Sequence, residues 1–133
     1  MSTYNTFEEL PVWQKSIELA ECVFSLIEES SLKNEFELKR QIQKSVISVS
    51  SNIAEGFERG SKKEFIHFLY IAKGSCGELR SQLLLAKLLH NSPNKIILDM
   101  CDYACEVSRQ INGFISYLKS TGFQGQKYQC QSI

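Results

Sequence analysis

Residues 51–65 read SNIAEGFERGSKKEF, and within this stretch one helix ends and another begins. Gly60 suits the left-handed backbone position that commonly follows the last turn of a helix. Ser61 and Glu64 have the spacing of a capping box, in which the serine side chain caps the new helix and the glutamate returns a hydrogen bond. The stretch therefore predicts two helices joined by a tight turn, which makes them antiparallel.

Apolar residues recur every three or four positions on both sides of this turn, which is the period of an amphipathic helix. The β-branched run Val46–Val49 does not indicate a strand, because the helical spacing continues on both sides of it. Helices are predicted from about residue 11 to 29, with Pro11 in the first turn, from a cap at Asn34 to Arg59, from Ser61 to about His90, and from Ser92–Pro93 to about Ser120.

The same period predicts which residues face the core of each helix. They are Phe7, Leu10, Trp13, Ile17, Ala20, Phe24 and Ile27 in the first helix, Phe36, Leu38, Ile42, Val46, Val49, Ile53 and Phe57 in the second, Phe65, Leu69, Ala72, Cys76, Leu79, Leu83 and Ala86 in the third, and Ile97, Met100, Ala104, Val107, Ile111, Phe114 and Leu118 in the fourth.

Four long helices joined by short turns predict an all-α fold, an antiparallel up-down four-helix bundle. The chain has 133 residues, which suits one domain, and we assign residues 1–121 to it. Residues 122–133 have no periodicity and are predicted to be a flexible tail. Four further apolar residues fall off the core stripes, which predicts surface that a partner covers; they are Ile47, Ile66, Leu85 and Leu88.

Charge is balanced overall but unevenly distributed. Fifteen basic and fifteen acidic residues cancel, which counts against a dedicated nucleic-acid binder. Residues 1–30 hold six acids and one base, whereas residues 61–90 hold five bases and two acids. The asymmetry is consistent either with solvated helix faces or with complementary surfaces, within the bundle or between subunits.

The five cysteines and the hydropathy pattern bear on the compartment. The cysteines are odd in number and lack C-x-x-C spacing, which is typical of buried thiols in a reducing compartment and not of disulfides or a zinc site. No basic region followed by an apolar run marks a secretion signal. No segment approaches the roughly 18 apolar residues of a membrane helix. We predict a cytoplasmic protein with no membrane partner.

Three motifs, in this order, resemble a bacterial family. They are F-x-x-L-x-V-W-Q-K at Phe7–Lys15, S-x-x-S-N-I-A-E-G-F around Ser48–Phe57, and E-F-x-x-F-L-x-I-A-x-G-S-x-x-E-L at Glu64–Leu79. The family consists of the four-helix-bundle proteins first noticed as reading frames inside intervening sequences of 23S ribosomal RNA genes. The resemblance covers about residues 7–118.

This resemblance implies a homopentameric ring with no attached enzymatic activity. It also implies a likeness to the accessory variability proteins of diversity-generating retroelements, which bind reverse transcriptase and nucleic acid. The chain departs from the family at Gln43 and Lys44, where members often carry two arginines. Lysine cannot form the planar, bidentate fork that arginine makes with phosphate, so the departure weakens a nucleic-acid role.

Polar and small residues interrupt the second and third helices and form a candidate site. Its predicted members are Asn52, Glu55, Gly56, Gly74, Ser75 and Glu78. In one interpretation, the small residues allow close helix packing and the polar ones form hydrogen bonds between helices or subunits. In the other, Glu55 and Glu78 form a ligand or catalytic pocket.

No complete catalytic set is present. Glu64–His67 is a single E-x-x-H, whereas a di-iron bundle needs two such motifs and two further carboxylates. Gly74–Gly77 lacks the spacing and context of a nucleophile elbow and the ending of a phosphate-binding loop. The sequence therefore predicts no enzyme, no cofactor and no metal.

Lys73, Arg80 and Lys87 recur every seven residues and form a basic stripe along the third helix. A wider patch is predicted to include Lys39, Arg40, Lys44, Arg59, Lys62 and Lys63. These residues form a solvated face, a subunit contact with the acidic first helix, or a nucleic-acid contact.

The function predicted from these observations is a non-enzymatic, ring-forming adaptor that binds another macromolecule. An RNA- or DNA-binding accessory protein, associated with reverse transcriptase or ribosomal RNA, is the alternative. A small-ligand binder or an enzyme that uses Glu55 and Glu78 has the least support.

Overall fold

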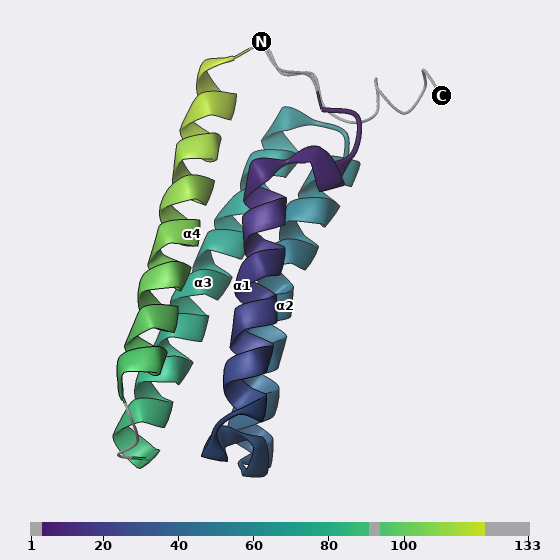
Figure 1. The fold of residues 1–133 in the computed structure, drawn as a ribbon. Helices are drawn as coiled ribbons and strands as arrows, with labels where there is room; N and C mark the ends of the chain where they lie inside the picture. The colour runs from purple at the N-terminus through teal and green to yellow at the C-terminus, as the bar shows by residue number, and fades with distance from the viewer. Residues whose placement is uncertain (1–3, 91–93, 122–133) are drawn as a thin grey trace.

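Four long helices run alternately up and down, and each one lies beside the helix that follows it in the chain (Figure 1). The computed structural model describes residues 4–90 and 94–121. The elements are η1 (Phe7–Glu9), α1 (Pro11–Glu28), η2 (Ser31–Asn34), α2 (Phe36–Glu58), α3 (Lys62–His90) and α4 (Asn94–Ser120). Because α4 also packs against α1, the four helices close into a bundle. The described residues contain no strand, so the predicted all-helical fold is confirmed.

The helix ends follow local chemistry, with one exception. Pro11 occupies the first turn of α1 as predicted. The predicted cap at Asn34 is wrong, because Asn34 is the last residue of the short helix η2 and Glu35 stands at the N-cap of α2. Ser30 caps the short helix η2, because its Oγ accepts from the backbone N–H of Leu32 at 3.2 Å. The predicted start of α4 at Ser92–Pro93 lies outside the described residues.

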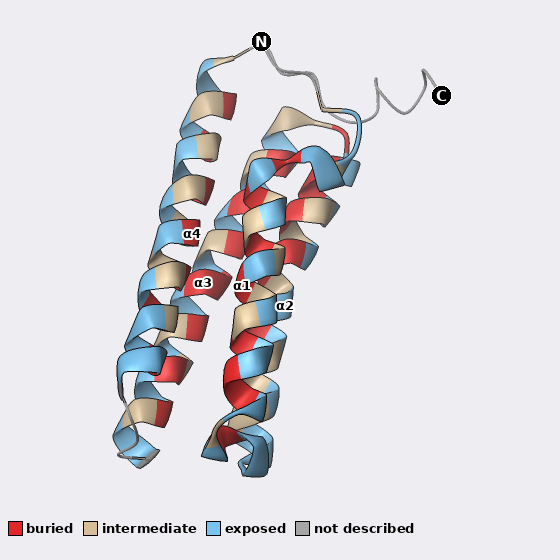
Figure 2. Ribbon diagram, viewed as in Figure 1, coloured by how far each residue is buried: buried red, intermediate tan, exposed pale blue. Residues whose placement is uncertain are grey.

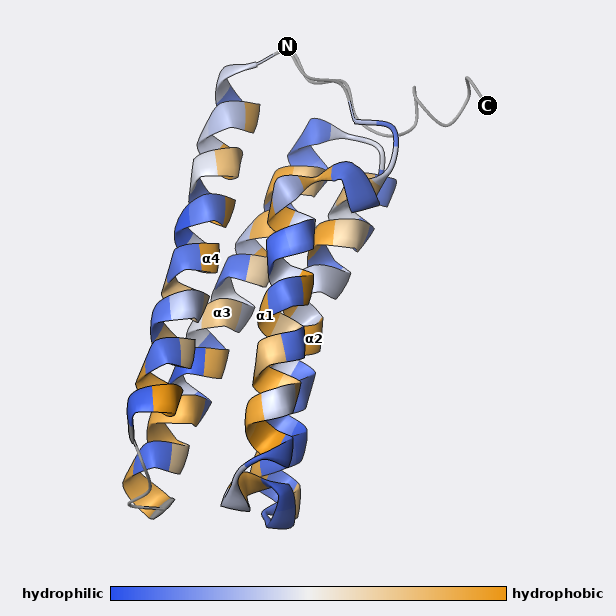
Figure 3. Ribbon diagram, in the orientation of Figure 1, coloured by the Kyte–Doolittle hydropathy of each residue, from blue (hydrophilic) through white to orange (hydrophobic). Residues whose placement is uncertain are grey.

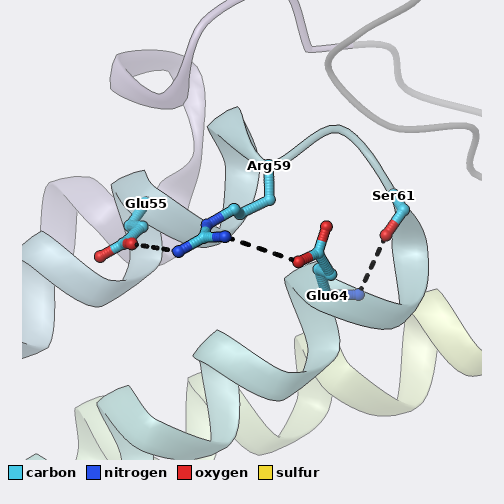
Figure 4. Close-up of polar contacts among 4 residues, drawn as sticks. All are labelled: Glu55, Arg59, Ser61 and Glu64. Atoms are coloured by element: carbon cyan, nitrogen blue, oxygen red, sulfur yellow. Dashed lines mark hydrogen bonds and ion pairs between the residues drawn. The ribbon is translucent and has the colours of Figure 1, made fainter.

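The turn between α2 and α3 has the predicted geometry. Gly60 has φ of 89°, the left-handed conformation that glycine adopts without steric penalty. Ser61 Oγ accepts from the backbone N–H of Glu64 at 3.2 Å and so caps α3. The Glu64 carboxylate turns instead toward Arg59, with its Oε1 3.7 Å from Nη1 (Figure 4). The serine half of the capping box is therefore confirmed, and an ion pair replaces the glutamate half.

The core lies along the bundle axis, where buried residues of the four helices face one another (Figure 2). All seven core residues predicted for α3 are buried, as are five of the seven for α2, from Ile42 to Phe57. The prediction that Phe36 faces the core is wrong, because 81% of its surface is exposed in the first turn of α2. There, Lys39 Nζ lies 5.7 Å from its ring centroid.

The prediction was least accurate for α1. Ile17 is half-buried and Phe24 is 38% exposed, whereas Leu19 and Val23 are completely buried. The remaining buried residues of this helix are Val12, Ser16, Leu26 and Ile27. Apolar residues cover a broad arc of α1, so the helical period was correct but the centre of the buried face was misplaced.

One end of the bundle exposes a group of apolar side chains that we call the apolar tip. Figure 3 shows hydrophobic residues at the end of α3 and at the start of α4. The tip comprises Leu84, Leu85, Leu88 and Leu89 of α3 and Ile96 and Leu98 of α4, with exposed fractions from 38% to 78%. The predicted surplus apolar surface is thus present at Leu85 and Leu88, and also at Ile47, but Ile66 packs against the core.

Candidate functional site

Hydrogen bonds between α2 and α3 form a line that we call the polar seam, with Ser45, Ser48 and Asn52 on α2 and Ser75 and Glu78 on α3. Ser45 Oγ donates to Glu78 Oε1 at 3.0 Å. The hydroxyls of Ser48 and Ser75 lie 2.9 Å apart. Ser45 and Ser75 are both buried. The seam therefore links the two helices at two levels.

Asn52 joins this seam from within its own helix. Its Nδ2 donates to the backbone oxygen of Ser48 at 2.8 Å and to Ser48 Oγ at 2.9 Å. Ser75 Oγ in turn donates to the backbone oxygen of Ile71 at 3.2 Å. These bonds orient a chain of donors from Asn52 through Ser48 and Ser75 to the Ile71 carbonyl, so each hydroxyl both accepts and donates.

The sequence analysis missed Ser45 and Ser48, although a signal for them exists. Ser45, Ser48 and Asn52 are spaced by three and four residues, which places them on one face of α2. Ser75 and Glu78 have the same three-residue spacing on α3. Two such polar rows on successive antiparallel helices are a pattern that can pair across the interface.

Glu55 lies away from the seam, at the turn. Its Oε2 is 2.9 Å from Arg59 Nη2, and half of its side chain is exposed (Figure 4). The Arg59 guanidinium also lies 5.0 Å from the ring centroid of Phe68. The hydrogen bond that Arg59 donates to Glu55 is the main cause that raises the pKa of Arg59 above its usual value. Glu55 therefore takes part in a surface ion pair.

The structure does not bring Glu55 and Glu78 together. Glu78 is bonded to Ser45, which lies ten residues before Glu55 on α2. Ten residues of helix span about 15 Å, so the two carboxylates sit at different levels of the bundle. They do not form the paired arrangement that general acid–base catalysis by two carboxylates requires.

Gly56 marks a very close contact of α2 with α3. A Cβ built on Gly56 would lie 2.7 Å from the Cβ of Phe68 and 3.1 Å from Cδ1 of Phe65. Gly74 and Gly77 differ from it, because a Cβ on either would meet nothing within 4 Å. Close packing therefore explains the glycine at 56 and does not explain the glycines at 74 and 77.

The basic stripe lies on the side of α3 that faces α4. Lys73, Arg80 and Lys87 are all half-buried, and among the described residues none of them has an ion-pair partner. The Nε of Arg80 is buried without a hydrogen-bond acceptor. A pocket of about 400 Å³ opens beside them between α3 and α4, lined by Tyr70, Lys73, Gly74, Gly77, Arg80, Cys105 and Ser108.

The remaining predicted basic residues do not form one patch with this stripe. Lys39, Arg40 and Lys44 lie at the start of α2, and Arg40 is paired with Glu37 at 3.1 Å. Arg59 and Lys62 lie about 30 Å further along, at the opposite end of the bundle. There, Lys62 Nζ donates to the backbone oxygen of Thr121 at 2.7 Å. The neighbouring Lys63 is exposed.

The cysteines and the potential metal ligands are the remaining groups that could carry out chemistry. Cys22, Cys76, Cys101 and Cys105 are free thiols. Cys76 and Cys101 are buried as predicted, whereas Cys22 and Cys105 are only half-buried, and Cys130 lies outside the described residues. Burial raises the pKa of the Cys76 thiol to about 12 and also raises that of Cys101, which disfavours the reactive thiolate at both. Within residues 4–90 and 94–121, no three potential metal-binding side chains gather at one place.

Comparisons with known proteins show the family of the chain and a solved structure with a similar fold. The sequence pattern of the 23S rRNA-intervening sequence protein family matches residues 8–113, more than half of the chain. The fold is similar to the crystal structure of a protein of unknown function from the S23 ribosomal protein family of Bacteroides thetaiotaomicron. That similarity has a TM-score of 0.70 at 25% sequence identity and covers 78% of this chain and 97% of the other. No curated protein has a matching sequence. None of the described helices is long and apolar enough to cross a membrane.

Proposed function

Because the chain belongs to the 23S rRNA-intervening sequence protein family, and because it exposes the apolar tip, we propose that it is a non-enzymatic, ring-forming adaptor that binds another macromolecule. The tip is the observation that carries the proposal. Leu88 and Leu89 are 78% and 65% exposed, and neighbouring Leu85 and Ile96 are about half exposed. Apolar side chains exposed together at one end of a bundle are typical of an interaction site.

We propose a second copy of the chain as the first partner of the tip. Every copy carries the same tip, and a contact between two different faces of neighbouring copies generates a ring when the rotation closes. The pentamer comes from the family resemblance. The likeness to accessory variability proteins and a cytoplasmic location stay predictions of the same kind.

The test is the oligomeric state of the full chain by light scattering and native mass spectrometry. We expect a closed oligomer, most simply a pentamer, and expect the double variant Leu85→Asp, Leu88→Asp to dissociate it while keeping its helical circular dichroism. The double variant Asn112→Asp, Ser116→Asp is the matched control, because it places the same two charges on exposed positions in the other half of α4. A monomeric parent protein at micromolar concentration would refute the ring.

A binding role has further support from what the polar residues do. Glu55 of α2 and Glu78 of α3 lie at different levels of the bundle, and each is engaged by another side chain. Cys76 and Cys101 are buried thiols with raised pKa values. These features favour binding over catalysis by any of the groups that the sequence analysis singled out.

The unpaired basic stripe favours a second candidate function, an RNA- or DNA-binding accessory protein. Lys73, Arg80 and Lys87 carry positive charge that no carboxylate of the described residues neutralises through an ion pair. Phosphate contacts by such residues give an affinity that falls steeply with salt. Fluorescence anisotropy with a labelled RNA should show this salt dependence of the affinity. Lys87→Gln should reduce the salt dependence, whereas Lys33→Gln, on the exposed η2, should leave it unchanged. Equal effects of both variants would contradict a specific interface.

A further inference from the structure

The pocket between α3 and α4 has the size of a small-molecule site. Its volume of about 400 Å³ falls within the range of about 300–1,000 Å³ that is common for ligand pockets. Five of its lining residues come from consecutive turns of α3, and Cys105 and Ser108 of α4 close the other side. The pocket is therefore built from two rigid helices, which hold the lining groups in place.

The lining is cationic and contains no carboxylate. Lys73 and Arg80 lie two helical turns apart on α3 and both face the pocket. A third cation stands at its edge, because Lys119 Nζ donates to Tyr70 Oη at 2.9 Å. On α4, Glu106 is already held by Arg109 at 2.8 Å. The local charge therefore favours an anion.

One donor in this lining is unsatisfied. Arg80 Nε is shielded from solvent and has no acceptor. A buried N–H without an acceptor is destabilising, and an arginine presents several donors in a fixed plane. An oxyanion in the pocket would accept from the terminal N–H groups of Arg80, which are not buried as Nε is, and the hydroxyls of Tyr70 and Ser108 can donate to its other oxygens.

The two glycines of the lining keep the pocket open. Glycine is unfavourable in the middle of a helix, where Gly74 and Gly77 lie. No neighbouring atom excludes a side chain at either position, because a Cβ there would meet nothing within 4 Å. Their position between Lys73 and Arg80 leaves space where any larger side chain would enter the pocket. Access to the cations explains these glycines, whereas helix packing does not.

We propose that this pocket binds a phosphoryl group, with Lys73 and Arg80 as its cations and Ser108 and Tyr70 as hydroxyl donors. A phosphate monoester carries about −1.5 to −2 charges near neutral pH and several strong acceptor oxygens, which matches two cations better than a single carboxylate does. The phosphoryl group belongs either to a small ester or to a nucleic acid. The inference does not depend on the ring or on the adaptor role.

Cys105 provides a direct reporter for the test, because it lines the pocket and is half-buried, as is Cys22 on α1. The full-length protein is treated with N-ethylmaleimide, and modification of each cysteine is followed by peptide mass spectrometry. Inorganic phosphate, adenosine monophosphate, an RNA oligonucleotide and succinate are the added probes. We expect a phosphate-containing probe to slow modification of Cys105 in a saturable manner and to leave Cys22 unchanged.

Three variants sharpen this experiment. Arg80→Gln removes a charged hydrogen bond and should weaken the protecting affinity about tenfold. Gly77→Leu fills the pocket but keeps both cations, and should abolish protection. Lys33→Gln removes an exposed cation of η2, outside the lining and outside the basic stripe, and should change nothing. Circular dichroism melts confirm that each variant is folded, and Lys73→Gln replaces Arg80→Gln if the latter is not.

The probes also identify the source of the phosphoryl group. Protection by inorganic phosphate and adenosine monophosphate assigns the pocket to a small ester, whereas protection by RNA alone assigns it to a nucleic acid. Equal protection by succinate would overturn the preference for phosphate. Absence of saturable protection by every probe, or equal loss in Arg80→Gln and Lys33→Gln, would overturn the site itself. Light scattering on the same samples reports the ring separately.

Discussion

The two flanks of α3 have opposite characters. On the flank that faces α2, Ser75 and Glu78 are hydrogen-bonded to α2, and Gly56 brings the backbones so close that a methyl group has no room. On the flank that faces α4, Lys73 and Arg80 have no ion-pair partner among the described residues, and a pocket opens above the glycines.

The contrast shows that polar residues of one helix differ in whether a neighbouring helix supplies their partners. Ser75 and Lys73 are two positions apart in sequence, yet one is satisfied by a neighbouring helix and the other has no charged partner. Polar groups that are fully bonded specify how helices pack, because breaking them strands buried partners. Cations that face open space remain available to a ligand. The α2 flank is thus structural, and the α4 flank is where binding is proposed.

The largest contrast between the flanks is expected from adding one methyl group to each. Gly56→Ala should lower the free energy of unfolding by about 1–3 kcal/mol from overpacking, partly offset by the roughly 1 kcal/mol that alanine gains over glycine in a helix. Gly77→Ala should be neutral or stabilise by up to about 1 kcal/mol, since its Cβ meets nothing. Urea denaturation measures both, and shifts of the same sign and size would abolish the contrast.

Removing one hydroxyl from the polar seam should have a smaller effect. Ser48→Ala removes one hydrogen bond from Asn52 and one from Ser75, which both keep a bond to a backbone oxygen, so we expect a loss of about 1–2 kcal/mol in the free energy of unfolding. Ser51→Ala is the control, as Ser51 is exposed on the same helix. In the double variant with Ser75→Ala, the losses should be non-additive by about 0.5 kcal/mol or more. Strict additivity would mean that the bond between the two hydroxyls contributes nothing.

The smallest effect is expected at the turn. Glu55→Gln breaks an ion pair whose two side chains are about half exposed, and such pairs are screened by solvent. The melting temperature and the oligomeric state should therefore remain within experimental error of the parent protein. A large loss of stability would show that Glu55 belongs to the structural flank after all, and its carboxylate would then need a partner beyond Arg59.

Local sequence determined the helices and most of their ends. Gly60 and Ser61 predicted the turn between α2 and α3 because left-handed glycine and serine capping depend only on a few adjacent residues. The core face of α3 was also predicted correctly, although this helix exposes further apolar residues such as Ile71, Leu88 and Leu89. The centre of the buried face of α1 was misplaced, and Asn34 failed as a cap because it is the last residue of the short helix η2.

Which polar residues form hydrogen bonds and ion pairs with one another depends on how the helices pack. Sequence spacing grouped Asn52 and Glu55 on one side of α2, but the packing of α3 gives Asn52 a place in the seam and leaves Glu55 at the surface with Arg59. The same holds for Gly56 and Gly77, which are alike in sequence and opposite in surroundings. The physical reason is that helix formation depends on neighbours along the chain. Satisfaction of a hydrogen bond, or room for a methyl group, depends on the distance and rotation of a second helix, which the spacing within one helix does not encode.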